Sequence, residues 1–293
     1  MSHVLAEIAS QPACWRLATS AVPKAAAALP TPGERVAVIG CGTSWFMAMA
    51  YAGLREAAGL GWTDAFTASE FLPSRRYDRV IGISRSGTTT EVVRALATVA
   101  PGTRTTALVG SLATPVAGAA DATVDLSFAD ERSVVQTRFA TSVLAFLRAG
   151  LGEDLTPAIA DAEEAVTAAL PRRWADADQV AYVGQGWTVG LAQEAALKLR
   201  EASQGWGEAY PAMDYRHGPI AIAQPGRIVW AFGPVPQGLA DEVAATGAEF
   251  VWSPADPMAD LIRAQRLAVA RAQALGLDPD HPRNLTRSVV LAG

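Results

Sequence analysis

The sequence has little cysteine and little histidine. Its 293 residues include two cysteines, Cys14 and Cys41, and three histidines, His3, His217 and His281. Two cysteines are too few for a disulfide framework, which agrees with a reducing compartment. Cysteine and histidine do not recur together at the spacing of metal ligands, so we expect no metal site.

An excess of basic residues and long apolar runs are also missing. Lysine and arginine number 24 against 29 acidic residues, and the net charge is −5 without any basic block. We therefore expect no nucleic acid partner. No stretch approaches the roughly 20 apolar residues of a membrane span. The start of the sequence lacks the cationic segment and apolar run of a signal peptide. We expect a cytoplasmic protein without a membrane contact.

The apolar residues that are present occur in short blocks. Half of the residues are hydrophobic and 18% are charged, as in a well-buried globular protein. Short β-branched runs predict strands, and the stretches between them have helical character. The predicted strands lie at residues 35–39, 80–83, 105–109, 122–126, 179–183, 227–232 and 249–252. The predicted helices lie at residues 45–58, 91–99, 138–148, 162–170, 194–203 and 260–275.

This alternation of strands and helices predicts an α/β fold with parallel sheets. The alternation stops in a polar stretch at residues 151–161 and returns at residue 179. The chain is long enough for two domains of ordinary size. We therefore predict one domain at residues 1–152, which begins with a short helical lead, and a second domain at residues 153–293, which ends in a tail.

Two of the predicted strands run directly into turns rich in glycine and hydroxyl groups. The first turn is GCGTS at residues 40–44, and the second is SRSGTTT at residues 84–90. A strand, a glycine turn and a helix form a phosphate-binding arrangement, because the helix N-terminus offers unpaired N–H groups. Helix capping by serine or threonine is the alternative. One cap needs one hydroxyl, so five hydroxyls beside Arg85 favour a bound oxyanion.

The stretch at residues 194–219 carries groups that can move protons. Glu194, Lys198 and Glu201 stand four and three residues apart, so they share one side of a predicted helix. Glycines and Pro211 end the helix, and His217 follows in a turn. A carboxylate on a helix, a nearby lysine and a histidine could supply acid–base chemistry. The alternative is a solvated helix face with an ordinary ion pair.

Taken together, these motifs resemble the sugar isomerase (SIS) domain family, and within it the isomerase half of glucosamine-6-phosphate synthase and its stand-alone relatives. The resemblance covers nearly the whole chain, with the motifs in a fixed order. They are EIASQP at residues 7–12, CGTS at 41–44, SRSGTT at 84–89, ERSVVQTRFAT at 131–141, the segment at 194–219, and PRNLTRSV at 282–289. The resemblance implies two SIS domains, each a three-layer αβα sandwich around a parallel sheet.

The resemblance also implies a phosphorylated sugar as substrate, with no cofactor. The residues that match the family's phosphate-binding positions are Thr43, Ser84, Ser86 and Thr89. Two further residues, Ser44 and Val134, match positions that touch the sugar.

Three residues match the family's catalytic positions. Glu201 matches the base that moves a proton between C1 and C2, and Lys198 matches a lysine that supports the site. His217 matches a ring-opening histidine that the neighbouring subunit donates. The family match therefore implies a homodimer with shared active sites.

The sequence departs from the synthase at three points. Arg287 replaces a lysine of the tail, and a guanidinium stays protonated, so it cannot form an imine with a keto sugar. It could still hold a phosphate or an oxygen atom. Arg85 replaces a glutamine in the phosphate turn and would add a charge-assisted contact. The glutamine-hydrolysing half is absent from the sequence, so we do not expect glutamine as a nitrogen source.

The activity that we expect is that of an aminosugar-phosphate isomerase/deaminase. It would convert glucosamine 6-phosphate, or an isomer, to a ketose 6-phosphate and ammonia. A simple aldose–ketose phosphate isomerase and a fructosamine-phosphate deglycase are the alternatives within enzymes. A sugar-phosphate-binding regulator is the alternative outside them. Such sensors usually carry a DNA-binding module, and the sequence has neither a helix-turn-helix extension nor a basic patch.

Overall fold

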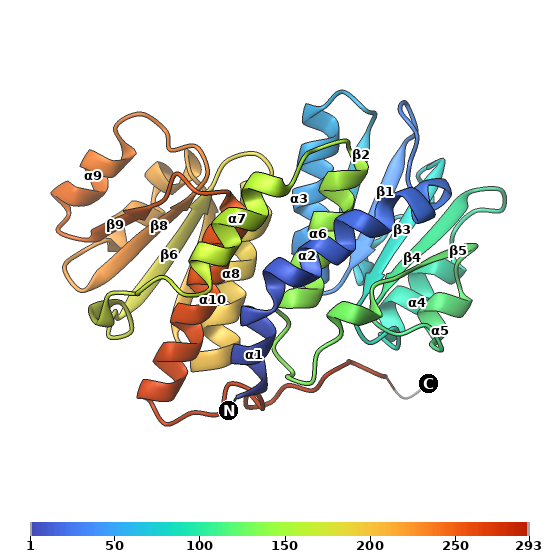
Figure 1. Ribbon diagram of the computed structural model, residues 1–293. Helices are drawn as coiled ribbons and strands as arrows, with labels where there is room; N and C mark the ends of the chain where they lie inside the picture. Colours follow the sequence, from blue (N-terminus) through green and yellow to red (C-terminus); the bar gives the residue numbers. More distant parts are fainter. Residues whose placement is uncertain (1, 292–293) are drawn as a thin grey trace. The chain divides into compact units, whose positions relative to one another are not determined.

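The computed structural model describes residues 2–291, and the chain divides into two compact units (Figure 1). The first-sheet unit comprises residues 13–131, residues 136–155 and the tail from Thr286. The second-sheet unit comprises the chain up to Pro12, residues 132–135 and residues 156–285. Each unit contains one parallel sheet flanked by helices, so the predicted α/β fold is confirmed. The division of the sequence after residue 152 stays a prediction.

The first-sheet unit is built on five parallel strands in the order β2-β1-β3-β4-β5. The strands are β1 (Val36–Gly40), β2 (Thr63–Thr67), β3 (Arg79–Ser84), β4 (Arg104–Val109) and β5 (Ala122–Asp125). The helices are α2 (Gln11–Ala21), α3 (Thr43–Ala57), α4 (Thr90–Ala97), α5 (Pro115–Gly118) and α6 (Arg138–Gly150), with short 3₁₀ turns η1 (Val22–Ala28), η2 (Ala68–Glu70) and η3 (Ser127–Ala129).

Both faces of this sheet are buried, as the apolar runs require. Ala37 and Ile39 pack in one core cluster with residues of α4 and α5. Because side chains alternate along a strand, Val36 and Val38 point to the opposite face, where α3 and α6 lie. The helices therefore form a layer on each side of the sheet.

The strand order places a switch point between β1 and β3. From β1 the chain crosses through α3 to β2 on one side, and from β3 it crosses through α4 to β4 on the other side. In open parallel sheets, ligands bind beyond the carboxyl ends of the strands at such a point. The turns at residues 40–44 and 84–90 follow the carboxyl ends of these two strands. The fold thus puts both hydroxyl-rich turns at the expected ligand position.

The second-sheet unit has four parallel strands in the order β7-β6-β8-β9. The strands are β6 (Gln179–Gly184), β7 (Trp206–Pro211), β8 (Arg227–Phe232) and β9 (Glu249–Trp252). The helices are α1 (His3–Ala9), α7 (Thr156–Ala165), α8 (Thr188–Ser203), α9 (Leu239–Ala245) and α10 (Pro257–Ala274), with 3₁₀ turns η4 (Arg172–Trp174), η5 (Asp214–His217) and η6 (Pro219–Ile222).

Aromatic side chains fill one side of this second sheet. The rings of Tyr182, Trp230 and Phe232 lie with their centroids 6.1–6.4 Å apart. The indole Nε1 of Trp230 donates a hydrogen bond of 2.7 Å to Asp260 of α10. Burial raises the pKa of Asp260, although this hydrogen bond and Arg263 oppose the rise. The pair attaches α10 to the sheet.

Several predicted helix boundaries were wrong, and a proline explains the largest of these errors. Pro157 lies in the first turn of α7 rather than in a loop, so this helix runs over Thr156–Ala165 instead of residues 162–170. Pro12 likewise lies in the first turn of α2, so a second helix directly follows the short helical lead, which is α1. A first turn tolerates proline because its N–H groups have no partner within the helix. The strands β2 and β7 were not predicted. None of the described helices combines the length and apolar character needed to cross a membrane.

Candidate functional site

The first hydroxyl-rich turn is tightly folded against the start of α3. Thr43 and Ser44 begin this helix, and both are buried. A Cβ atom at Gly40 would lie 2.7 Å from the carbonyl carbon of Ser44, so only glycine allows this close return of the chain. Ser84 ends the adjacent strand β3 and is also buried. The structure therefore brings predicted phosphate-binding residues of both turns to the edge of one strand pair.

The second turn gathers its hydroxyl groups in a small hydrogen-bonded cluster. The Oγ of Ser84 lies 3.2 Å from the Oγ1 of Thr89 and accepts a hydrogen bond of 3.1 Å from the Gly87 N–H. The Oγ of Ser86 accepts from both the N–H and the hydroxyl of Thr88, at 3.2 and 3.1 Å. Thr89 precedes α4, yet its side chain makes no capping hydrogen bond. Helix capping therefore does not account for the Thr89 hydroxyl.

The C-terminal tail runs along this second turn. The hydroxyls of Ser86 and Thr88 lie 3.1 and 2.9 Å from the Oγ of Ser288. The Thr90 N–H donates to the Val289 carbonyl at 3.3 Å, and the Leu291 N–H donates back to the Thr90 hydroxyl at 3.0 Å. The tail thus contacts the groups that the sequence assigns to phosphate.

The two arginines near this turn lie beside acidic residues. The guanidinium of Arg85 is buried, with its Nη1 3.7 Å from the Oε2 of Glu131. Its Nη2 donates a hydrogen bond of 3.1 Å to the carbonyl of Arg287. The Nη2 of Arg287 lies 2.5 Å from the Oδ1 of Asp130. A phosphate contact of Arg85 or Arg287 would compete with these carboxylates, and it stays a prediction.

The acid–base groups of the second-sheet unit form a partly buried chain on α8. Glu194 and Lys198 are buried, whereas the Glu201 side chain retains 19% of its exposure. The Nζ of Lys198 lies 3.5 Å from the Oε1 of Glu194 and 2.5 Å from the Oε2 of Glu201. The alternative of a solvated helix face is therefore wrong for Glu194 and Lys198. A buried ammonium holds the Glu201 carboxylate in a fixed orientation.

Glu201 faces an open cavity of about 490 Å³. The other lining residues come from the same end of α8, the turn after it and the start of the tail, namely Leu197, Arg200, Gln204, Gly205, Arg283, Asn284 and Leu285. Gln204 ends the helix in the left-handed conformation, with φ of 53°. This bend turns the chain away and leaves the Glu201 carboxylate accessible. A small polar ligand could approach it there.

The structure does not bring His217 to Glu201 within this unit. Glu201 lies near the end of α8, just before the amino end of β7, and His217 follows the carboxyl end of β7 in η5. The six residues of β7 therefore lie between Glu201 and His217 along the strand direction, a separation of roughly 20 Å. The His217 side chain is exposed.

Val134 lies in a loop that a buried carboxylate holds. Glu7 of α1 accepts hydrogen bonds from the N–H groups of Arg132 and Ser133 at 2.6 and 3.3 Å. The Val134 N–H donates to the carbonyl of Asp280 at 3.1 Å. The sequence did not predict this role for Glu7. Its only signal was the EIASQP motif in the family resemblance.

No group of three or more histidine, cysteine or acidic side chains that could hold a metal ion occurs within residues 2–291. Burial raises the pKa of the Cys41 thiol in the first turn to about 11, so this cysteine is protonated at neutral pH. It is therefore a poor nucleophile there.

Comparison with curated proteins finds relatives that include glutamine--fructose-6-phosphate aminotransferases. The chain is 28% identical to glutamine--fructose-6-phosphate aminotransferase [isomerizing] from Gloeobacter violaceus, over 88% of the chain and 52% of the relative. It is also 28% identical to the protein of that name from Aquifex aeolicus, with the same coverage. The chain spans about half the length of the curated relatives that it matches, and this half is their isomerase (SIS) half. No family model matches the sequence.

Comparison with solved structures identifies the fold. The glucosamine-6-phosphate deaminase of Thermotoga maritima superposes with a TM-score of 0.82 at 23% identity, and the match covers 99% of this chain and 100% of that chain. The tagatose-6-phosphate ketose/aldose isomerase of Escherichia coli superposes with a TM-score of 0.79 at 18% identity, over 98% and 96% of the two chains. The chain therefore has the fold of the SIS proteins.

Proposed function

Because the chain is homologous to the isomerase half of the aminotransferases and has the SIS fold, we propose that it is a phosphosugar isomerase. More narrowly, we propose that it converts an aminosugar 6-phosphate to a ketose 6-phosphate and ammonia. The observation that carries the proposal is the Glu201 carboxylate, which a buried lysine orients and which faces an open cavity.

In this proposal the turn at residues 84–89 binds the phosphate. Its hydroxyls are gathered at the carboxyl end of β3, and α4 begins directly after them. Hydroxyl and N–H donors at a helix N-terminus suit a phosphate dianion. The phosphate lies far from the reacting carbons, so it supplies binding energy and orientation rather than chemistry.

Glu201 is the proposed base for the isomerisation. Its carboxylate takes the proton from C2 of the open-chain sugar and returns it to C1. The ammonium of Lys198, 2.5 Å away, keeps the carboxylate in position between the two steps. In an aminosugar this transfer converts the C2 amine into an imine. Water then adds to C2, the C2–N bond breaks, and ammonia leaves.

A second candidate is an aldose–ketose phosphate isomerase, which stops after the proton transfer because C2 carries oxygen. The likeness to the isomerase of Escherichia coli favours this candidate, and the likeness to the Thermotoga deaminase favours deamination. A fructosamine-phosphate deglycase is a third candidate, in which an amine other than ammonia leaves.

Product analysis tests these activities directly. The protein is incubated with glucosamine 6-phosphate, tagatose 6-phosphate and a fructosamine 6-phosphate, and ammonia, sugar isomers and released amine are measured. Ammonia from glucosamine 6-phosphate, absent with Glu201→Gln, supports the deaminase. Isomerisation without ammonia replaces it with the aldose–ketose isomerase. Binding of all three sugars without any turnover overturns the enzyme proposal in favour of a sugar-phosphate sensor.

A further inference from the structure

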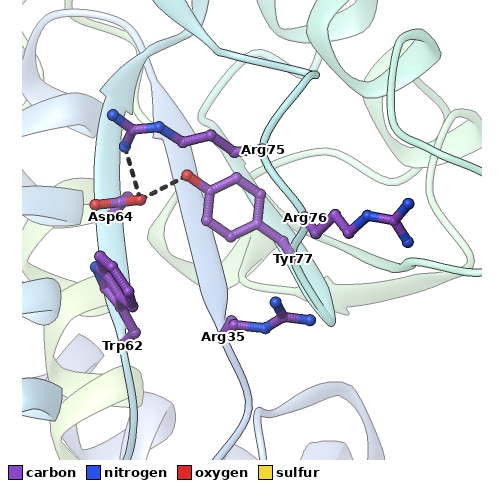
Figure 2. Close-up of a pocket in the computed structure, with 6 residues that line it drawn as sticks. All are labelled: Arg35, Trp62, Asp64, Arg75, Arg76 and Tyr77. Carbon is purple, nitrogen blue, oxygen red and sulfur yellow. Dashed lines mark hydrogen bonds and ion pairs between the residues drawn. The ribbon is translucent and has the colours of Figure 1, made fainter.

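The first-sheet unit has a polar cavity of its own, which the proposed activity does not use (Figure 2). Its volume is about 390 Å³, within the usual range for small-molecule sites. Its lining residues are Arg35, Trp62, Asp64, Arg75, Arg76 and Tyr77. Three guanidinium groups and an indole thus lie around one cavity, although the chain has a net charge of −5.

This cavity lies at the end of the first sheet where the strands begin. Arg35 directly precedes β1, Trp62 directly precedes β2, and residues 75–77 lead into β3. The hydroxyl-rich turns follow the carboxyl ends of β1 and β3. Strands of five and six residues separate the two edges by roughly 15–20 Å. A ligand in this cavity therefore does not contact the proposed phosphate turn.

Alternate side chains of the edge strand β2 and of the residue before it form one wall of the cavity. Trp62, Asp64 and Phe66 are two residues apart, so they share a face of the strand. Figure 2 shows Arg75 and Tyr77 directed at Asp64 from the loop before β3. The guanidinium of Arg75 also lies over the ring of Phe66, 5.8 Å from its centroid. These contacts fix the wall before any ligand arrives.

Asp64 holds two of the lining side chains in place, and the cavity still keeps an excess of positive charge. It lies 3.1 Å from the Nη1 of Arg75, and it accepts a hydrogen bond of 2.6 Å from the hydroxyl of Tyr77. Burial and this hydrogen bond raise the pKa of Tyr77 to about 12, so the phenol is neutral at physiological pH. Arg35 forms an ion pair of 3.1 Å with Asp78. Three arginines against two aspartates leave an excess of one positive charge.

Arg76 is the cation available to a ligand. Its side chain is exposed, and within residues 2–291 it has no hydrogen bond or ion pair to the protein. In Figure 2 its guanidinium points away from Asp64. Trp62 is 68% exposed, which leaves its indole face open to stacking. The cavity thus combines a free guanidinium with a free aromatic face.

We propose that this cavity binds a small phosphorylated compound with a planar ring, of the nucleotide class. The ring stacks on the indole of Trp62, and the phosphate pairs with Arg76. Because the cavity lies at the opposite end of the strands from the proposed phosphate turn, this site is separate from the proposed substrate site. This inference does not depend on the proposed isomerase activity.

Calorimetric titration of the full chain tests the proposal, with UMP and AMP as nucleotide probes and with uridine and inorganic phosphate as their separated parts. We expect saturable binding of at least one nucleotide and about tenfold weaker binding of each part. Trp62→Ala and Arg76→Ala should each weaken nucleotide binding about tenfold. Trp252→Ala and Arg94→Ala, which change an exposed tryptophan and an exposed arginine outside the cavity, should leave it unchanged.

Three results would overturn the proposal. Nucleotide binding that survives both Trp62→Ala and Arg76→Ala places the ligand elsewhere. Phosphate that binds as tightly as the nucleotides, without loss in Trp62→Ala, reduces the cavity to an anion site. Absence of saturable binding of both nucleotides also overturns it, and a lower oligomeric state of Trp62→Ala by light scattering would then make this surface a contact between copies of the chain. Circular dichroism of each variant checks that the fold is retained.

Discussion

Lys198 sits between two carboxylates that have different access to solvent. Glu194 is buried on one side of the ammonium, and Glu201 borders a cavity on the other side. The buried carboxylate keeps the lysine in place, and the lysine orients the accessible carboxylate. The same lysine therefore links a structural role to the proposed chemistry.

Replacing the Glu201 carboxylate should separate binding from proton transfer. In Glu201→Gln we expect affinity for the sugar phosphate to stay near that of the wild type, because the phosphate turn is unchanged. Turnover should fall about 10²–10⁴-fold, the usual contribution of a general base. The measurement is the rate at which solvent deuterium enters C1 or C2. Glu164→Gln, an exposed carboxylate on α7, is the matched control. Exchange at the wild-type rate in Glu201→Gln would assign the base elsewhere.

Removing hydroxyl groups from the phosphate turn should raise the Michaelis constant for the sugar phosphate. Ser86→Ala and Thr89→Val each remove one hydroxyl from the turn, and a hydrogen bond to a charged group contributes roughly 1.5–3 kcal/mol. We expect KM for the phosphorylated sugar to rise about tenfold or more, with a smaller change in kcat. Steady-state kinetics measure both, and Ser69→Ala at an exposed position of the same unit is the control. Unchanged KM values in both variants would move the phosphate to another site.

At the scale of the elements, one buried carboxylate connects the beginnings of strands β3 and β4 in the first sheet. Glu34 pairs with Arg79 at 3.1 Å and with Arg104 at 2.6 Å. Burial alone would raise the pKa of Glu34, but hydrogen bonds from Thr31 and Arg79 outweigh it and lower the pKa below 4.5. A lowered pKa in the folded state means that protons bind the unfolded chain more readily. The stabilisation is therefore present above pH 4.5 and is lost as the pH falls through the folded-state pKa.

We expect Glu34→Gln to lower the free energy of unfolding by about 2 kcal/mol at neutral pH, because a buried charged hydrogen-bond partner is removed. The difference from the wild type should shrink on acidification below pH 4.5. Urea unfolding at a series of pH values measures it. A difference that grows as the pH falls would show that the carboxylate of Glu34 is not stabilising.

The sequence predicted the central strands of both sheets and missed one edge of each. β1, β3, β6 and β8 are continuous apolar runs because both of their faces are buried. The missed strands, β2 and β7, lie at sheet edges, and most of their residues are only partly buried. An edge strand needs no apolar run, and β7 even contains glycine and proline. Its formation depends on a neighbouring strand, which a local pattern does not record.

The candidate site also combines local patterns, which the sequence predicted, with long-range contacts, which it did not. The hydroxyl turns and the spacing of Glu194, Lys198 and Glu201 are local patterns, so they were visible in the sequence. The contact between Glu7 and the loop before Val134 joins residues 125 positions apart. The pairing of Arg85 with Glu131 is also long-range. Such partners are chosen by the fold, and no spacing rule predicts them.

At the scale of the whole molecule, the position of His217 bears on the number of chains in an active site. Glu201 precedes the beginning of β7 and His217 follows its end, so the two residues lie far apart within their own unit. We therefore predict that His217 contributes to the active site of another copy of the chain. Inactive Glu201→Gln and inactive His217→Ala are mixed, and their subunits are exchanged. Each heterodimer would then contain one intact pair, so activity should return. Each variant exchanged with itself is the control.

Verified heterodimers without activity would contradict the shared site. They would place His217 at its own chain's site or outside catalysis.

The division of the chain into units also affects how the protein can be dissected. A single cut within residues 136–155 would leave helix α1 on the N-terminal fragment, although α1 belongs to the second-sheet unit. The same cut would leave the tail from Thr286, which contacts the turn at residues 84–90, on the C-terminal fragment. Neither fragment would contain all segments of its own unit. The two halves of the polypeptide are therefore better produced together, as a complementing pair that reassembles, than as separately expressed domains.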